Sequence, residues 1–130
     1  GRLVVWLSEG KSSPERVRAA LIGWYKDHSR NKLREKSSRY AKIVGVTPAS
    51  INIKTFQSRW GSCHSDGKIQ FNWKIIMAPN RIVDYVVVHE LCHLKQPDHS
   101  SVFWKEVGQV IPGYQECREW LKENGRWLEV

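Results

Sequence analysis

The most restrictive feature of this sequence is an apolar run that leads directly into a cluster of histidines. Residues 82–88 read Ile-Val-Asp-Tyr-Val-Val-Val, and residues 89–93 read His-Glu-Leu-Cys-His. An apolar run of this kind is typical of a buried helix. Burying histidines and a glutamate there is costly unless something pairs with them. The segment therefore predicts a buried helix that carries a polar site.

The spacing within this cluster indicates a metal site. Residues four apart lie one turn apart on the same helix face, so His89 and His93 can direct two imidazoles at one ion. Glu90 is rotated from His89 by about 100°, which lets it reach a water at the ion without binding the ion itself. This is the H-E-x-x-H arrangement of zinc hydrolases.

His99 is the candidate third ligand. Pro97 lacks an N–H and disfavours the helical conformation at Gln96, so the chain is expected to turn there and bring His99 back. Three protein ligands and one water are typical of a catalytic zinc site, whereas structural sites have four protein ligands. Zinc is inferred from the ligand type, and imidazoles also bind cobalt, nickel or copper.

A long helix is predicted before this segment. Ser12 or Ser13 caps it, Pro14 suits its first turn, and Gly45 ends it. Its expected apolar face comprises Val17, Leu21, Trp24 and His28, then Leu33, Tyr40, Ile43 and Val44.

Residues 50–73 predict a three-stranded antiparallel meander. Apolar residues alternate in its first and last strands, and Asp66-Gly67 between β-type runs indicates a hairpin. Gly61 indicates a bulge or a close backbone approach. Residues 2–7 also have the pattern of a strand.

Three further helices complete the prediction. The histidine helix runs from Pro79-Asn80 to about Lys95, the next is capped within residues 98–100 and stops at 111–113, and the last spans about Tyr114 to Glu123. We expect residues 1–130 to form a single domain. Because the sequence opens in a strand-like run and its only methionine is Met77, we expect that this domain was excised from a longer chain with upstream strands.

Charge and cysteine content bear on location and partners. The three cysteines, Cys63, Cys92 and Cys117, include no C-x-x-C pair, so reduced thiols and a cytoplasmic location are expected. The net charge is +8, and residues 30–42 carry six basic side chains against one acid, Glu35. These residues form either a solvated outer face or a surface for DNA and other phosphates. The basic residues are Arg30, Lys32, Arg34, Lys36, Arg39 and Lys42.

The chain resembles the YgjP-like and SprT-like zinc metallopeptidases of the zincin group over roughly residues 14–125. The resemblance rests on the Arg-Trp-Gly-Ser-Cys block at 59–63, on Ile69 and Asn72-Trp73, and on residues 85–93. It continues in His99-Ser100-x-x-Phe103-Trp104 and in the Pro-x-Tyr and Trp-Leu pairs within 112–121.

The resemblance implies an α+β, zincin-like domain with a long N-terminal helix, a small antiparallel sheet, a buried H-E-x-x-H helix and two C-terminal helices. It implies zinc held by His89, His93 and His99, with Glu90 as the catalytic base acting on protein or peptide substrates. SprT-like proteins are associated with DNA-bound substrates, which would suit the basic residues. Metzincins share the His93–His99 spacing, but they have glycine where Gln96 stands and a later methionine that is absent here.

Two other functions remain open. The domain is alternatively a zinc-containing module that docks nucleic acid or protein without proteolysis, although such a site has no use for Glu90. Hydrolysis of a non-peptide amide or ester would use the same chemistry. Arg59, His64 and Tyr114 are candidates for stabilising the oxyanion, and the strand holding Gly61 and Ser62 is the candidate substrate edge.

Overall fold

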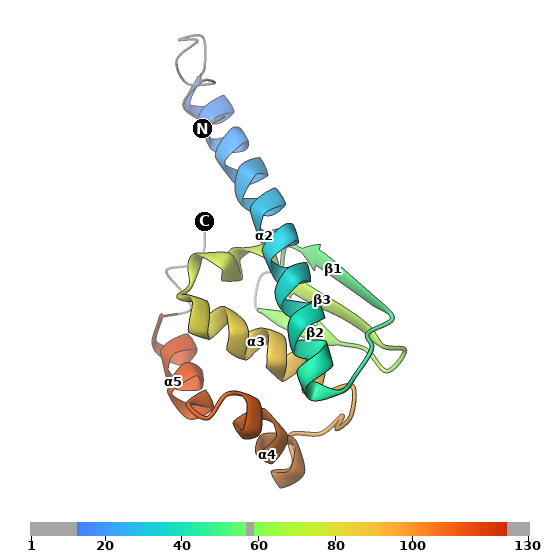
Figure 1. Cartoon of the computed structure of the whole chain (residues 1–130). Helices are drawn as coiled ribbons and strands as arrows, with labels where there is room; N and C mark the ends of the chain where they lie inside the picture. Colours follow the sequence, from blue (N-terminus) through green and yellow to red (C-terminus); the bar gives the residue numbers. More distant parts are fainter. Residues whose placement is uncertain (1–12, 57–58, 125–130) are drawn as a thin grey trace.

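Helix α2 (Pro14–Val44) is the longest element, and it starts and ends where the sequence predicts. The computed structural model describes residues 13–56 and 59–124, so the strand expected at residues 2–7 lies outside the described residues. The Ser13 side chain accepts a hydrogen bond from the Arg16 N–H, and Gly45 ends the helix with a φ of 85° that favours glycine. The first half of α2 projects beyond the rest of the described chain (Figure 1).

The predicted apolar face of α2 is wrong in its first half. Leu21 and Trp24 are 37% and 43% exposed, whereas Leu33 is completely buried. Trp24 and Leu33 are nine residues apart, which is two and a half turns, so they lie on opposite sides of the helix. The body of the domain packs against the Leu33 side only. Ile43, at the other end of the helix, is also exposed.

The sheet is small and mixed. It comprises β1 (Ser50–Lys54), β2 (Gly61–Cys63) and β3 (Lys68–Asn72), in the spatial order β1-β3-β2. The predicted hairpin is confirmed, because β2 and β3 pair antiparallel and His64 and Lys68 are hydrogen-bonded across the turn.

The antiparallel pairing predicted for the first strand is wrong, because β1 pairs with β3 in parallel. The connection after β1 is tied to the end of β3: the Asn72 side-chain amide donates to the carbonyls of Phe56 and Arg59, both at 3.0 Å. The chain therefore passes the end of β3 and then forms β2 on the side of β3 that is opposite β1.

The remaining elements follow the predicted order closely. A short helix, η1 (Trp73–Met77), leads to α3 (Asn80–Cys92), then α4 (Ser101–Val110) and α5 (Tyr114–Asn124). Helix α3 lies between α2, β2, α4 and α5, and it is the centre of the core (Figure 1). The largest fully buried side chains are Phe71, Phe103, Leu33, Ile69, Ile75, Ile82, Leu91, Val83, Val87, Val88 and Val107.

An ion pair joins α2 to α3 inside this core. The Lys36 ammonium donates to the Asp84 carboxylate at 2.6 Å, and the Lys36 side chain is only 8% exposed. Lys36 therefore does not contribute to a basic surface on α2. Among the helices in the described residues, none combines the length and apolar character needed to span a membrane.

Candidate metal centre and active-site cleft

Helix α3 carries His89 and Glu90 on its last turn, and His93 follows directly after it. The helix ends at Cys92, three residues before the predicted end, and His93 is its C-cap with helical backbone angles. The next N–H groups bond to carbonyls three residues back, so the chain tightens into turns before leaving the helix. His89 and His93 consequently keep the one-turn spacing on which the predicted site depends.

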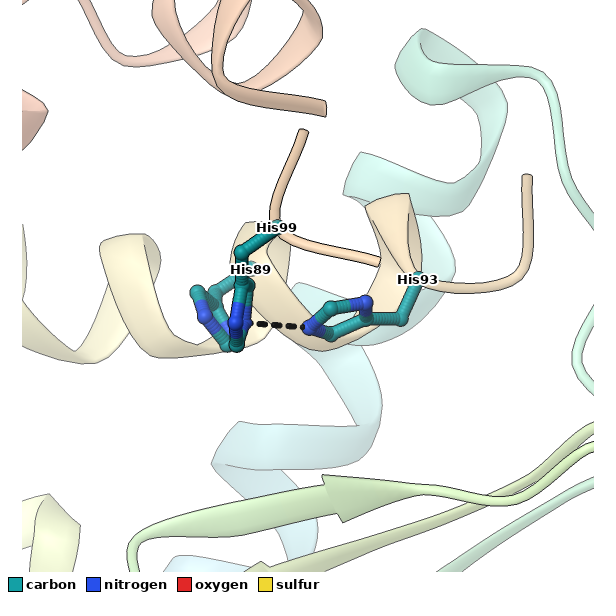
Figure 2. A group of neighbouring side chains, drawn as sticks. All are labelled: His89, His93 and His99. Atoms are coloured by element: carbon teal, nitrogen blue, oxygen red, sulfur yellow. Dashed lines mark hydrogen bonds between the residues drawn. The ribbon is translucent and has the colours of Figure 1, made fainter. Parts of the chain in front are cut away.

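His99 returns to the same place from the segment after α3. It precedes Ser100, whose hydroxyl caps α4 by accepting a hydrogen bond from the Phe103 N–H. One ring nitrogen from each of the three histidines lies within 4.8 Å of the others. The Nε2 atoms of His93 and His99 are 2.9 Å apart, and the three rings gather in one cluster (Figure 2).

Glu90 is buried beside this cluster and faces Gly61 of β2. A β-carbon at Gly61 would lie 3.0 Å from Cγ and 3.1 Å from Oε2 of Glu90. The close backbone approach predicted at Gly61 is therefore confirmed, and the carboxylate is the group it accommodates.

A cleft of about 890 Å³ opens between α3 and the β2–β3 hairpin. The three histidines and Glu90 line one side, and Gly61, Cys63 and the hairpin turn line the other. Its volume is within the usual range for ligand-binding pockets.

The family of the chain follows from a match over almost its whole length. Residues 4–124 match the family described as YgjP-like, metallopeptidase domain. The chain belongs to this family. Among solved structures, it is similar to the metallopeptidase zymogen of Pyrococcus abyssi abylysin, with a TM-score of 0.63 and 23% identity over 72% of this chain and 95% of that chain. At that identity the similarity shows a common α+β fold. No curated protein matches the sequence.

Membership of the YgjP-like metallopeptidase family implies a metal ion, and the histidine cluster fits one. The Nδ1 atom of His93 is 3.0 Å from the Gln96 carbonyl oxygen, which can only accept, and this contact favours a proton on Nδ1 and a lone pair on Nε2. The Nδ1 atom of His89 is 3.1 Å from Glu90 Oε2, and this contact likewise favours a proton on Nδ1 and a lone pair on Nε2. The pKa of His99 is lowered by burial and by the neighbouring His93 and His89, which favours the neutral imidazole that binds metals.

Two aromatic residues of α4 support the cluster, a role that their sequence pattern alone does not indicate. Phe103 stacks on His93, with ring centroids 4.3 Å apart, and Trp104 stacks on His99 at 5.6 Å. Trp104 also stacks on Tyr114, with ring centroids 5.2 Å apart, and the Arg118 guanidinium lies over its ring at 4.3 Å. The one sequence feature that could have indicated this support is the Phe103-Trp104 pair, which lies about one helical turn after His99.

The oxyanion candidates occupy different places. Arg59 and His64 are exposed and line the cleft. Tyr114 stacks on Trp104 and is not among the residues that line the cleft.

The cysteines are not placed as metal ligands. Cys92 is fully buried in the core. Cys63 lines the cleft, and burial, with the nearby Glu90 and Asp66 carboxylates, raises its pKa to about 11, which disfavours the thiolate needed for metal binding.

Proposed function

We propose that this domain is a zinc-dependent endopeptidase in which His89, His93 and His99 hold the ion and Glu90 is the general base. The observation that carries the proposal is the convergence of three imidazole nitrogens within 4.8 Å of one another, beside a buried carboxylate. A site with three protein ligands leaves a coordination position for chemistry. This arrangement favours a hydrolase over a module that only docks partners.

The proposed role of Glu90 is to move a proton between water and the leaving group. Its carboxylate lines the cleft with the three histidines, so it accepts a proton from the attacking water and delivers it to the departing amine. When bound, zinc would supply a Lewis acid for the substrate carbonyl and lower the pKa of the water. Gly61 keeps the space in which the Glu90 side chain lies.

We propose that an extended substrate pairs with β2. Within the described residues β2 has β3 as its one strand neighbour, and no strand of that part of the chain pairs with its other edge. Gly61 on this strand lies directly against Glu90, which would bring a paired peptide backbone to the carboxylate. Exposed Arg59 and His64 line the same cleft and are the proposed donors to the oxyanion.

The decisive experiment compares wild type with Glu90→Gln. Zinc content is measured by elemental analysis, and hydrolysis is measured on casein, an unstructured protein. Glu119→Gln on α5 is the matched control, because Glu119 is exposed and outside the cleft. We expect one zinc per chain in all three proteins and loss of hydrolysis only in Glu90→Gln.

Two results would contradict the proposal. Full activity in Glu90→Gln would remove the assignment of the base. One zinc per chain with no cleavage by wild type, of casein or of short peptides, would favour the docking module.

DNA association through residues 30–42 stays a prediction. Lys36 is buried in its ion pair with Asp84, and Arg30 pairs with Asp27, so the basic surface is smaller than the sequence indicates. Adding single-stranded DNA to the casein assay at two salt concentrations tests it, because phosphate contacts weaken steeply as salt rises.

A further inference from the structure

A small cavity lies where α2 packs against β1, away from the metal centre. It has a volume of about 270 Å³, and none of the described residues that line it also lines the active-site cleft. The proposed hydrolysis therefore gives this cavity no role. Its lining residues are Lys26 and Arg30 of α2, Ile53 and Lys54 of β1, Thr55 directly after β1, and Trp73 at the start of η1.

Positive charge converges on this cavity from two elements. Lys26 and Arg30 lie one turn apart on α2, and Lys54 lines the same cavity from the end of β1. In the part of the chain that the structure describes, no carboxylate lines the cavity and neither lysine is ion-paired. Arg30 pairs at 3.1 Å with Asp27, whose side chain is 77% exposed. Three cations and this one carboxylate give a local net charge of +2, which an anion would neutralise.

Thr55 adds a neutral hydrogen-bond donor to the cavity. The Trp73 Nε1–H donates to Thr55 Oγ1 at 3.0 Å, so the hydroxyl accepts this bond and keeps its own proton for another acceptor. Trp73 is only 3% exposed, and the Lys26 ammonium lies 5.9 Å from the centre of its ring. The buried ring therefore contacts both the hydroxyl and the ammonium. A ligand in this cavity meets donors on several sides, and the complementary ligand is an anion with several acceptor oxygens.

We propose that this cavity binds a phosphate dianion, either inorganic phosphate or the phosphate group of a small phosphorylated molecule. Phosphate presents several acceptor oxygens to the two ammonium groups, the guanidinium and the hydroxyl. A terminal phosphate carries nearly two negative charges at neutral pH, which matches the local net charge. Pockets that enclose a complete drug-sized ligand have volumes of about 300–1,000 Å³, so a cavity of this size suits one phosphate group and the atoms next to it.

The observations favour such a dianion over the backbone of a nucleic acid. Each backbone phosphate is a diester with one negative charge, and the chain continues from it on both sides. A small concave site with a local charge of +2 is better matched by a dianion that enters by its end. Proteins that bind single strands also stack bases on exposed aromatic rings, whereas the Trp73 ring is buried.

The test measures binding of inorganic phosphate, glycerol phosphate and dimethyl phosphate by calorimetry at constant ionic strength. Dimethyl phosphate is the diester control, with a single charge. Lys26→Met and Lys54→Met each remove one positive charge and keep an apolar stem. Lys105→Met is the matched control, because Lys105 is exposed on α4 and does not line the cavity. Asp27→Asn removes the carboxylate that competes for Arg30.

We expect wild type to bind inorganic phosphate and glycerol phosphate about tenfold more tightly than dimethyl phosphate, because they carry a second charge. Lys26→Met and Lys54→Met should each weaken binding of the dianions by about tenfold, since a hydrogen bond from a charged group is lost. Lys105→Met should leave the affinity unchanged, and Asp27→Asn should raise it by about threefold, because Arg30 is released from its surface pair. The tighter of the two dianions identifies the source of the phosphate.

Three results would overturn the proposal. The first is the absence of saturable phosphate binding by wild type. The second is an equal loss of affinity in Lys105→Met, which would indicate a general attraction to a basic protein. The third is binding of dimethyl phosphate or single-stranded DNA as tightly as the dianions, which would indicate a nucleic-acid surface instead. Melting temperatures without phosphate show that each variant is folded, and if one lysine variant unfolds, the other and Asp27→Asn decide the outcome.

Discussion

Gly61 and Glu90 approach each other so closely that a β-carbon on the strand would push the Glu90 side chain aside by a few tenths of an ångström. Any β-carbon at position 61 would lie 3.0 Å from Glu90 Cγ and 3.2 Å from the Gln70 carbonyl oxygen. Gly61 does not have a positive φ, so the requirement for glycine here comes from the neighbouring atoms.

Gly61→Ala is therefore expected to displace Glu90 while the histidines stay in place. We predict that zinc content is unchanged and that kcat/KM on a peptide falls by about tenfold to a hundredfold, because small misplacements of catalytic groups are costly. Gly23→Ala is the control: Gly23 lies within α2 with open space around it, and alanine there should raise stability by about 1 kcal/mol. Wild-type activity in Gly61→Ala would show that the contact does not position Glu90.

Trp104 is expected to tune metal affinity through His99. Removing its ring in Trp104→Ala frees the His99 imidazole, and loss of such supporting contacts typically weakens metal binding by about tenfold to a hundredfold. Trp104→Phe should retain most of the affinity. Competition with a chromophoric chelator measures the zinc dissociation constant, and Trp24→Ala removes an exposed tryptophan on α2 as the control. Equal affinities in wild type and Trp104→Ala would contradict a role in holding His99.

The Lys36–Asp84 pair is expected to dominate the attachment of α2 to α3. Asp84→Asn leaves a buried ammonium without its counter-charge, and we predict a loss of about 3 kcal/mol in the free energy of unfolding. Asp27→Asn breaks the exposed Arg30–Asp27 pair and should cost less than about 0.5 kcal/mol. Urea denaturation of both variants measures the difference. Similar losses would mean that the buried pair contributes no more than the exposed one.

Cys63 should react slowly with iodoacetamide at neutral pH. Its pKa is raised to about 11, so at pH 8 on the order of one thiol in a thousand is ionised. Since the thiolate fraction grows as pH rises toward the pKa, the labelling rate should increase about tenfold per pH unit from 7 to 10. Mass spectrometry follows the modification, and Cys63→Ser should abolish it because Cys92 and Cys117 are buried. A rate that levels off near pH 9 would indicate an ordinary thiol.

Local signals predicted the helices well, because their ends are determined by residues within one turn. Ser13 and Pro14 start α2, Gly45 ends it, and Ser100 starts α4. The histidine cluster was predictable for the same reason, since a helical spacing and one turn at Pro97 suffice to bring its members together.

Pairings between distant parts of the chain were not predictable in this way. Alternation in β1 indicates a strand but not its neighbour, and the parallel pairing with β3 is accompanied by hydrogen bonds from Asn72 to the connection after β1, which no local pattern indicates. Trp24 has the spacing of a core residue, yet it is exposed, because periodicity does not show which side of a helix is covered. The contact of Gly61 with Glu90 joins elements far apart in sequence, so it could not be predicted without the fold.

The shortness of β2 has a consequence for aggregation. An exposed strand edge is a template for pairing with other chains, and proteins limit that hazard by keeping such edges short. With three residues, one of them glycine, β2 presents too few backbone groups to seed an extended intermolecular sheet. An edge of this length favours brief encounters with a passing chain over permanent association with copies of itself.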